Sequence, residues 1–327
     1  MSSPEEIAHE RAPDSPTQLT RRSWWGVLKR TVAEFSNDNL TDWAAALTYY
    51  GVLSIFPGLL VLLSAFNLLG PDTAETVIQN ITQLAPANIR KLLTDSVEEL
   101  QRAEQAAGIL AVVGLLGALW TASGYVSAFM RAANAVYDVP EGRPIWKTVP
   151  IRLAVTVVCG TLLSVSALAV VLTGQVARYV GNLVGLGDTA VTVWDVAKWP
   201  VLIFLIMVVV AILYWASPNV RQSGFRWVSP GGVLAVLVWL IASAGFGVYL
   251  ANFASYNKTY GTLGGVIGFL VWLWISNIAL LLGAEFDAEL ERGRAIEGGL
   301  PPDQEPFIPL RDDRKVNKNA SPGLGSP

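Results

Sequence analysis

The sequence predicts an all-α integral membrane protein that crosses the membrane six times, with both termini in the cytoplasm. Three observations lead to this fold class: an apolar composition, six long stretches without charged residues, and an uneven distribution of basic residues between the connecting loops. Of the 327 residues, 52% are hydrophobic and 15% are charged, whereas a soluble domain has about one quarter charged residues. The mean hydropathy of +0.44 also favours a membrane environment.

The counts of charged residues, cysteine and histidine exclude several classes of protein. With 23 basic and 26 acidic residues, the net charge of −3 argues against a basic surface that binds nucleic acid. One cysteine and one histidine are too few for a disulfide framework or a zinc site. We therefore expect no metal, no cofactor and no nucleic-acid partner.

Six stretches of the chain lack Asp, Glu, Lys and Arg, and each is long enough to form a transmembrane helix. A helix needs about 20 largely apolar residues to cross about 30 Å of hydrocarbon. None of the stretches has the strict alternation of apolar and polar residues that marks the strand of a membrane barrel. We place the spans at about residues 43–70, 106–130, 151–176, 197–217, 229–252 and 262–286.

The basic residues orient these spans. If the N-terminus is cytoplasmic, 17 of the 23 basic residues fall in cytoplasmic segments and six fall outside, as the positive-inside rule requires. The first apolar run begins at Trp43 and is too long for the core of a cleavable signal peptide. We therefore expect a multi-pass protein with cytoplasmic N- and C-termini.

Two terminal segments, residues 1–20 and 298–327, are rich in Pro, Ser, Gly, Asp and Glu. Such segments have too few apolar side chains to offset the entropy lost on ordering. We expect both to be disordered cytoplasmic tails that flank a membrane domain at residues 21–297.

A short amphipathic helix is predicted ahead of the first span, within residues 20–39. At helical spacing, basic residues alternate there with apolar ones, namely Arg21, Arg22, Lys29 and Arg30 with Trp24, Trp25, Leu28, Val32 and Phe35. Such a helix lies at the membrane surface, with its basic side chains near anionic headgroups. Membrane lipids are therefore expected partners, either through an ordinary anchor or, more specifically, through a lipid sensor.

The first outer loop, residues 71–104, is the longest connection, and it predicts a small helical cap outside the membrane. Residues 89–100 place apolar side chains on one helical face, and Pro86 separates this helix from an earlier one. Further along the chain, Ser229 and Pro230 predict the start of the fifth helix, because serine caps helices and proline suits their first turn.

Polar and helix-breaking residues inside the spans are the candidates for a functional site. In the first span, Pro57 removes the hydrogen bond to the Leu53 carbonyl and predicts a kink. Tyr49 supplies a hydroxyl in the same span. A broken helix is one way in which transporters build binding sites, and the alternative is a kink that serves packing alone.

In the sixth span, Asn277 is the clearest uncharged polar residue. It either bonds to a neighbouring helix or faces a polar pathway. Gly264 and Gly268 form a pair of small residues one turn apart on the opposite side of the helix, which predicts close helix packing within the bundle or between subunits of a homo-oligomer.

Glu285 comes at the end of the sixth span, where the helix is still apolar. We expect it to face the bundle and to pair with a basic residue at the same depth, for which Arg131 after the second span is the best placed. Asn134 lies at the same end of the second span. The pair is either a fixed ion pair that locks the helix ends or part of a moving gate.

Six short sequence segments occur in order on the predicted spans and their ends. They are Asp38–Thr41, Tyr49–Tyr50 with Leu53–Pro57, Arg131–Asn134 with Tyr137–Pro140, Pro218–Val220, Ser255–Gly264 and Leu281–Glu285. As a set they resemble the YihY/BrkB family of bacterial inner-membrane proteins, over about residues 35–295. The resemblance implies a six-helix protein of the bacterial plasma membrane, in a family that has been labelled both ribonuclease BN and virulence factor, without an accepted catalytic or binding residue.

Three functions remain to be weighed. A transporter of a lipid, an amphipathic envelope precursor or a small solute is favoured, because the kinked first helix, Asn277, and Glu285 opposite Arg131 supply the minimum for a gated polar pathway. A non-transporting scaffold that binds an envelope protein would instead tolerate changes at these residues and depend on the apolar face of residues 89–100. A ribonuclease is disfavoured, because His9 lies in a tail and Cys159 in an apolar span, so we expect no enzyme.

Overall fold

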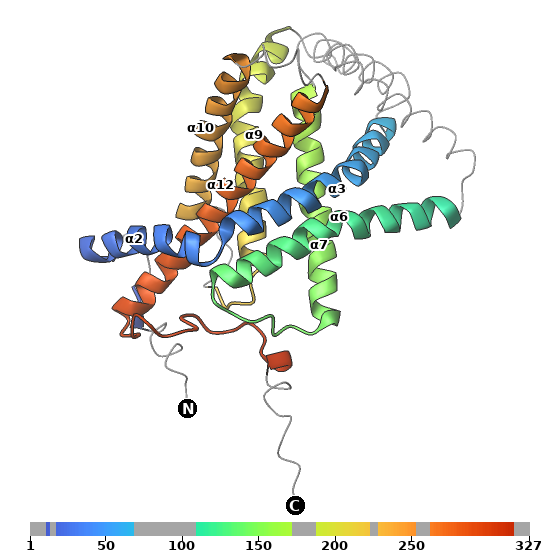
Figure 1. Ribbon diagram of the computed structural model, residues 1–327. Coiled ribbons are helices and arrows are strands. Elements are labelled where there is room, and N and C mark those ends of the chain that lie inside the picture. The colour runs from blue at the N-terminus through green and yellow to red at the C-terminus, as the bar shows by residue number, and fades with distance from the viewer. Residues whose placement is uncertain are drawn as a thin grey trace, which may run out of the picture. The chain divides into compact units, whose positions relative to one another are not determined.

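The computed structural model describes residues 11–13, 18–68, 109–171, 188–222, 228–252 and 262–316. The regular elements of these residues are α-helices (Figure 1). They are α2 (Arg21–Asn37), α3 (Leu40–Leu68), α6 (Ile109–Val136), α7 (Ile145–Val171), α9 (Asp188–Ala216), α10 (Pro230–Asn252) and α12 (Thr262–Glu297). The prediction of an all-helical protein is confirmed for this part of the chain.

Among the described residues, four helices are long and apolar enough to cross a membrane. They are Ile145–Val170, Thr192–Ala216, Pro230–Leu250 and Gly264–Glu297, and they correspond to the third, fourth, fifth and sixth predicted spans. The last is longer than predicted because α12 continues beyond its apolar part through a charged segment that pairs with α2. The protein is therefore a multi-pass membrane protein.

The chain divides into two compact units. The first comprises Met1–Gly51, Tyr125–Val155 and Val210–Pro327, and the second comprises Val52–Gly124 and Thr156–Val209. The boundaries fall within α3, α6, α7 and α9, so each of these helices contributes residues to both units.

In the first unit, α2 packs against α12 (Figure 1). Val27 and Leu290 are buried in this contact, and the rings of Trp24 and Phe286 lie 6.3 Å apart. Thr20 caps α2 by accepting a hydrogen bond from the Ser23 backbone N–H at 3.2 Å. The helix predicted ahead of the first span is therefore present, with one face against α12.

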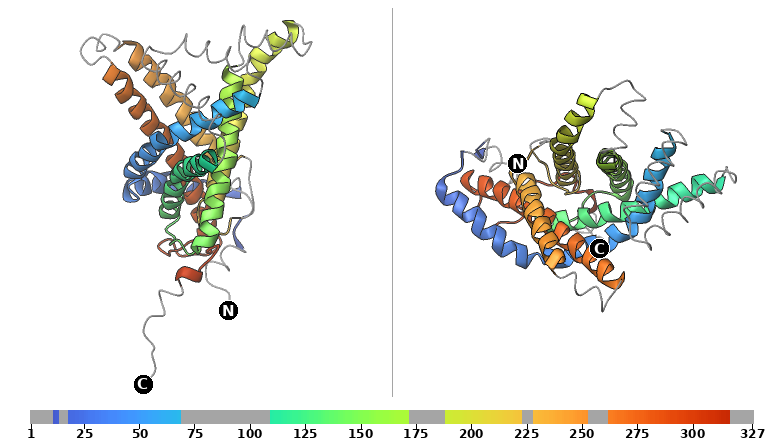
Figure 2. Two further views of the ribbon diagram at one scale, coloured as in Figure 1. Left: turned by 90° about the vertical axis from the view of Figure 1, so that its right-hand side faces the viewer. Right: turned by 90° about the horizontal axis from the view of Figure 1, so that it is seen from above.

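The second contact of α12 is with α10, and the two helices lie side by side (Figure 2). As predicted, α10 begins at Pro230, and Ser229 accepts a hydrogen bond from the Gly232 N–H at 2.9 Å. The backbones come close at Gly231 and Gly283, where an added Cβ on Gly283 would lie 2.3 Å from the Gly231 carbonyl oxygen. Glycine at both positions is what permits this approach.

After α12, residues 298–316 pack within the first unit, whereas the composition of residues 298–327 predicted a disordered tail. Phe307 is 2% exposed and stacks on Tyr137 with ring centroids 6.0 Å apart. Val220 and Leu310 form an isolated antiparallel bridge. A few well-placed apolar groups and backbone hydrogen bonds therefore order this segment despite its polar average.

The second unit contains the middle of α3, where Pro57 is buried and the helix remains continuous through it. Ser54 donates a hydrogen bond to the Ala122 carbonyl on α6 at 3.3 Å. On α9, the buried Lys198 pairs with Asp195 at 2.9 Å. The described part of this unit is held together by helix packing and by these local polar contacts.

Several predictions lie outside the described residues. They concern the outer loop at 71–104 with its helical cap, the connection between the fifth and sixth spans at 254–261, and the chain ends at 1–10 and 317–327.

Candidate functional site

Asn277 on α12 forms the centre of a buried polar network. The Asn277 side chain is 3% exposed; its Nδ2 donates to Thr48 Oγ1 at 3.1 Å, and the Tyr125 hydroxyl donates to its Oδ1 at 2.9 Å. Thr48 in turn donates to the Ala44 carbonyl at 2.8 Å. The network joins α3, α6 and α12, and because both ends of the Asn277 amide are bonded, it serves as a tie between helices.

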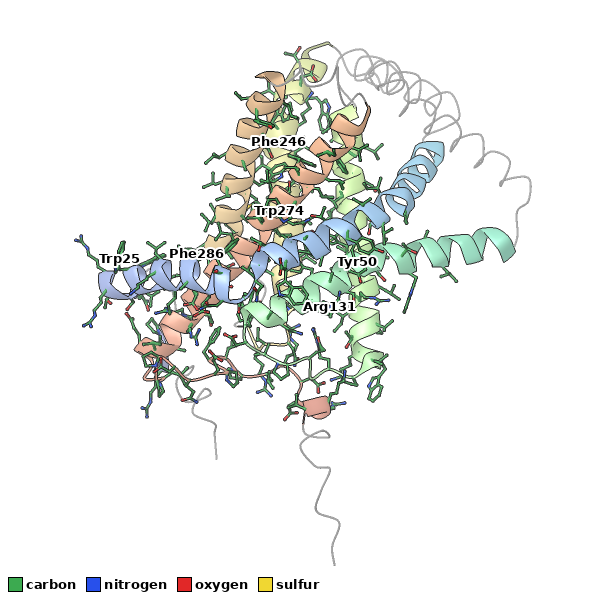
Figure 3. All side chains as sticks on the ribbon, viewed as in Figure 1. Trp25, Tyr50, Arg131, Phe246, Trp274 and Phe286 are labelled. Carbon is green, nitrogen blue, oxygen red and sulfur yellow. The ribbon has the colours of Figure 1, made fainter. Side chains whose placement is uncertain are left out.

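Arg131 on α6 contacts α3 rather than α12. Its guanidinium carbon lies 5.8 Å from the centroid of the Tyr50 ring, and Figure 3 shows the two side chains together. Arg131 Nη1 also donates to Ser127 Oγ at 3.2 Å. The rings of Tyr49 and Tyr50 lie in a T-shaped arrangement with centroids 5.3 Å apart, and Tyr49 is 61% exposed.

The structure does not bring Arg131 and Glu285 together. Glu285 on α12 is 1% exposed, and neither of its carboxylate oxygens has a hydrogen-bond partner in the described part of the chain. The side chain that it meets is the carboxyl group of Asp38. The predicted ion pair is thus replaced by a contact between two acids.

The turn between α2 and α3 places Asp38 against α12. Asp38 ends α2, and its backbone N–H donates to the Glu34 carbonyl at 2.8 Å. Asn39 follows with a φ of 52°, a left-handed conformation that asparagine tolerates better than most residues. The chain then enters α3 at Leu40, so this Asp-Asn turn fixes the position of the acid.

The environment of Asp38 is both buried and acidic. Burial raises the pKa of Asp38 to about 7, and the negative charges of Asp138 and Glu34 act in the same direction. Burial also raises the pKa of Asp138 to about 6, with the charge of Glu305 acting in the same direction and Arg292 opposing it. Asp38 and Asp138 therefore hold protons more tightly than they do in water.

Glu289, one turn beyond Glu285, provides a contrast on the same helix. It is 2% exposed, but it pairs with Arg30 of α2 and with Arg292 at 3.4 Å. Arg292 also pairs with Glu305 at 2.9 Å. The nearby basic side chains are thus engaged with Glu289 and its neighbours, and Glu285 is left facing Asp38.

Asn134, the remaining predicted polar residue, belongs to a structural lock at the end of α6. Its Oδ1 accepts from the Asn219 backbone N–H at 2.8 Å, and its Nδ2 donates to Glu141 at 3.0 Å. Glu141 receives two hydrogen bonds of 2.7 Å from Arg143. Arg143, which is 2% exposed, also donates to the Ser217 carbonyl at 2.6 Å.

The lock extends to the C-terminal segment through Asn219. Its side chain donates to the Asp312 carbonyl at 2.8 Å and accepts from the Asp312 N–H at 3.1 Å. The backbone N–H of Arg311 also donates to the Asn219 carbonyl at 2.9 Å. The ends of α6 and α9 are therefore tied together and to residues 309–315.

The sequence predicted close helix packing at Gly264 and Gly268, within the bundle or between subunits. Among the described glycines of α12, the closest approach to a neighbouring helix within the chain lies elsewhere. A Cβ on Gly268 would lie 3.6 Å from Leu250, an ordinary van der Waals distance. The close approach is instead made by Gly231 and Gly283. The sequence did draw attention to Gly283, because this residue lies in the Leu281–Glu285 segment that carried the family resemblance.

Metal ligands do not converge in the described part of the chain: no group of three His, Cys, Asp or Glu side chains there could hold an ion. Cys159 is a free, buried thiol on α7. The acids around Glu285 are therefore distinguished by burial and by the shortage of basic partners, and not by the geometry of a metal site.

Comparison with known proteins gives a consistent set of relatives. The family model described as virulence factor BrkB matches residues 31–306. The ribonuclease-like protein YfkH of Bacillus subtilis is 33% identical over 81% of this chain and 93% of its own length. A UPF0761 membrane protein of Ralstonia nicotianae is 31% identical over 77% of this chain and 56% of its own length. No solved structure shows a significant match.

Proposed function

The chain belongs to the virulence factor BrkB family, and on this premise we propose that it transports or translocates a lipid, an amphipathic envelope precursor or a small solute. In this proposal, the protein spans the bacterial plasma membrane six times, with both termini in the cytoplasm. In addition to the four candidate spans, α3 has 29 residues and α6 has 28, which is enough for each to cross a bilayer.

The observation that carries this proposal is the buried carboxyl group of Glu285. An ionisable side chain inside a membrane bundle is costly, and it marks a pathway or a coupling site more often than a packing role. Among the residues that the structure describes, Glu285 has no basic partner to neutralise it, whereas Glu289 on the next turn has two.

Membrane lipids are the proposed partners of α2. Its outer face exposes Trp25, Leu28 and Val32, with Trp25 71% exposed, and the exposed basic residues Arg22 and Lys29 flank this apolar strip. Figure 3 shows Trp25 on the helix. An apolar strip with basic flanks suits the headgroup region of an anionic leaflet.

Lipid translocation is tested by reconstituting the purified protein in liposomes and measuring the scrambling of a fluorescent lipid. The test variant is Glu285→Gln, which keeps the shape of the side chain and removes its ionisable carboxyl group. The matched control is Asp303→Asn, because Asp303 is an exposed acid beyond the end of α12. We expect scrambling by the wild type and by the control, and its loss in folded Glu285→Gln protein.

The alternative is a scaffold or regulator of envelope assembly, without transport. If the scrambling rate with the protein does not exceed the rate in protein-free liposomes, lipid translocation is refuted. Solute transport and the scaffold role then remain as the two alternatives. The scaffold requires a partner that is captured equally well by the wild type and by the Glu285→Gln variant. The proposal includes no catalytic step and no nucleic-acid substrate, and homo-oligomerisation is a further proposal that crosslinking would test.

A further inference from the structure

The contact between Asp38 and Glu285 needs an explanation that neither helix packing nor ion pairing supplies. Glu285 is 1% exposed, and its oxygens have no hydrogen-bond partner within the described ranges. A buried ionised carboxylate without such partners is strongly disfavoured. The group must therefore be neutral or must share its charge with something that binds between the two acids.

The charged groups that face this pair are mostly acidic. From α2 and its end come Glu34 and Asp38, from the segment after α6 comes Asp138, and from α12 comes Glu289. The basic residues nearby are Arg30 and Arg292, and both bind Glu289. Arg292 also lies 3.9 Å from Asp138. The surrounding negative charge therefore disfavours ionisation of Asp38.

No three possible metal ligands converge in the described residues, so the geometry there favours a proton over a coordinated metal ion. A proton is the smallest cation that can neutralise one of two adjacent carboxyl groups. The protonated group then donates its O–H to the other group, which accepts as a carboxylate. Paired carboxylic acids in other proteins take up and release their protons in two coupled steps for this reason.

We propose that Asp38 and Glu285 form a proton-binding site in which the pair holds one shared proton at neutral pH. Protonation adds one hydrogen ion to the doubly ionised pair and forms one O–H bond, and release returns that ion to water. Asp38 is half-buried and Glu285 is fully buried, so the proton enters and leaves through Asp38. The raised pKa of Asp38, about 7, supports this assignment.

The link of this site to transport rests on the proposed function. If the protein moves a cargo, a site that gains and loses a proton near neutral pH supplies a means of coupling that movement to a proton gradient. Proton binding itself does not depend on that function, and the test below measures it without any cargo.

Labelling with dicyclohexylcarbodiimide tests the proposal, because this apolar reagent reacts with protonated carboxylic acids. The purified protein is treated from about pH 5 to about pH 9, a range that brackets neutral pH, and the labelled residue is identified by mass spectrometry. The matched control is Glu289, which is equally buried on the same helix but bound to arginine. We expect Glu285 to be labelled at least about tenfold faster than Glu289 near neutral pH, with a rate that falls as the pH rises.

Two variants make the result specific. Glu285→Gln should lose the label, and its elution on size exclusion should show that it remains folded. Asp38→Asn removes the second acid, so the midpoint of the labelling curve of Glu285 should move to lower pH by about one unit or more. Equal labelling of Glu285 and Glu289, a rate independent of pH, or an unchanged midpoint in Asp38→Asn would each overturn the shared proton.

The outcomes separate this site from the proposed transport. The expected labelling without any liposome activity would support the proton site and refute translocation of the tested lipid. Lipid scrambling without labelling of Glu285 would refute the proton site and leave translocation standing.

Discussion

The contact between α10 and α12 depends on the absence of a side chain at Gly283. In the Gly283→Ala variant, the added Cβ would lie 2.3 Å from the Gly231 carbonyl oxygen, 2.6 Å from the Tyr214 hydroxyl and 2.7 Å from Ala235 Cβ. All three distances are well below van der Waals contact. Two of the three atoms belong to the backbone or to a Cβ, so no rotation of a side chain relieves the overlap, and the helices must move apart.

The expected cost follows from three contributions. Overpacking of a rigid contact costs about 1–3 kcal/mol, and backbone overlap belongs at the upper end. Displacement of the Tyr214 hydroxyl, which donates to the Leu280 carbonyl, costs about 1 kcal/mol, and the better helix propensity of alanine returns about 1 kcal/mol. We therefore expect Gly283→Ala to be destabilised by about 3 kcal/mol, or roughly 100-fold in the folding equilibrium.

Unfolding in mixed detergent micelles with increasing dodecyl sulfate, followed by tryptophan fluorescence, measures this difference. The matched control is Gly245→Ala on α10, where an added Cβ would meet nothing within 4 Å. The control should unfold at the same point as the wild type or slightly later. If Gly283→Ala were as stable as Gly245→Ala, the close approach of the two helices would be refuted.

Three further predictions concern the polar contacts. Asn277→Leu should be destabilised by about 1–2 kcal/mol in the same unfolding assay, because the Thr48 and Tyr125 hydroxyls lose a partner; an unchanged midpoint would refute the tie. Arg143→Lys should be destabilised by about 3 kcal/mol, because lysine cannot reproduce the bidentate contact with Glu141, and equal stability would contradict the lock. For Asp38, the pKa is raised from 3.8 to about 7 in the folded protein, so its ionisation opposes folding. The contribution of Asp38 to wild-type stability should therefore fall as the pH rises from about 4 to about 7. Asp38→Asn should be the more stable protein at about pH 8 and lose this advantage near pH 4; an advantage independent of pH would contradict the raised pKa.

The membrane helices could be identified from the sequence because each one is a single continuous stretch of uncharged residues. An uncharged stretch of sufficient length follows from the thickness of the bilayer and needs no knowledge of neighbours. The third to sixth predicted spans accordingly coincide with α7, α9, α10 and α12. The C-terminal segment shows the limit of composition, since the average over residues 298–327 hides Phe307, which a specific contact with Tyr137 buries.

The sequence selected the candidate residues by type, but their depth in the membrane did not identify their partners. Asn277 was expected either to bond another helix or to face a pathway, and it bonds Thr48 and Tyr125. Glu285 was assigned to Arg131 because the two lie at similar depth. Depth is set by position along a helix, whereas the partner is set by rotation about its axis, which changes by 100° with each residue.

The sequence by itself determined the environment of the protein, its helices and its family resemblance. The tertiary structure alone decided that Glu285 meets Asp38, that Gly283 rather than Gly268 makes the closest contact, and that Asn219 joins the C-terminal segment to α6. These features depend on distances between residues that lie far apart in the chain. Packing selects them by shape and hydrogen bonding across helices, and local composition carries no record of either.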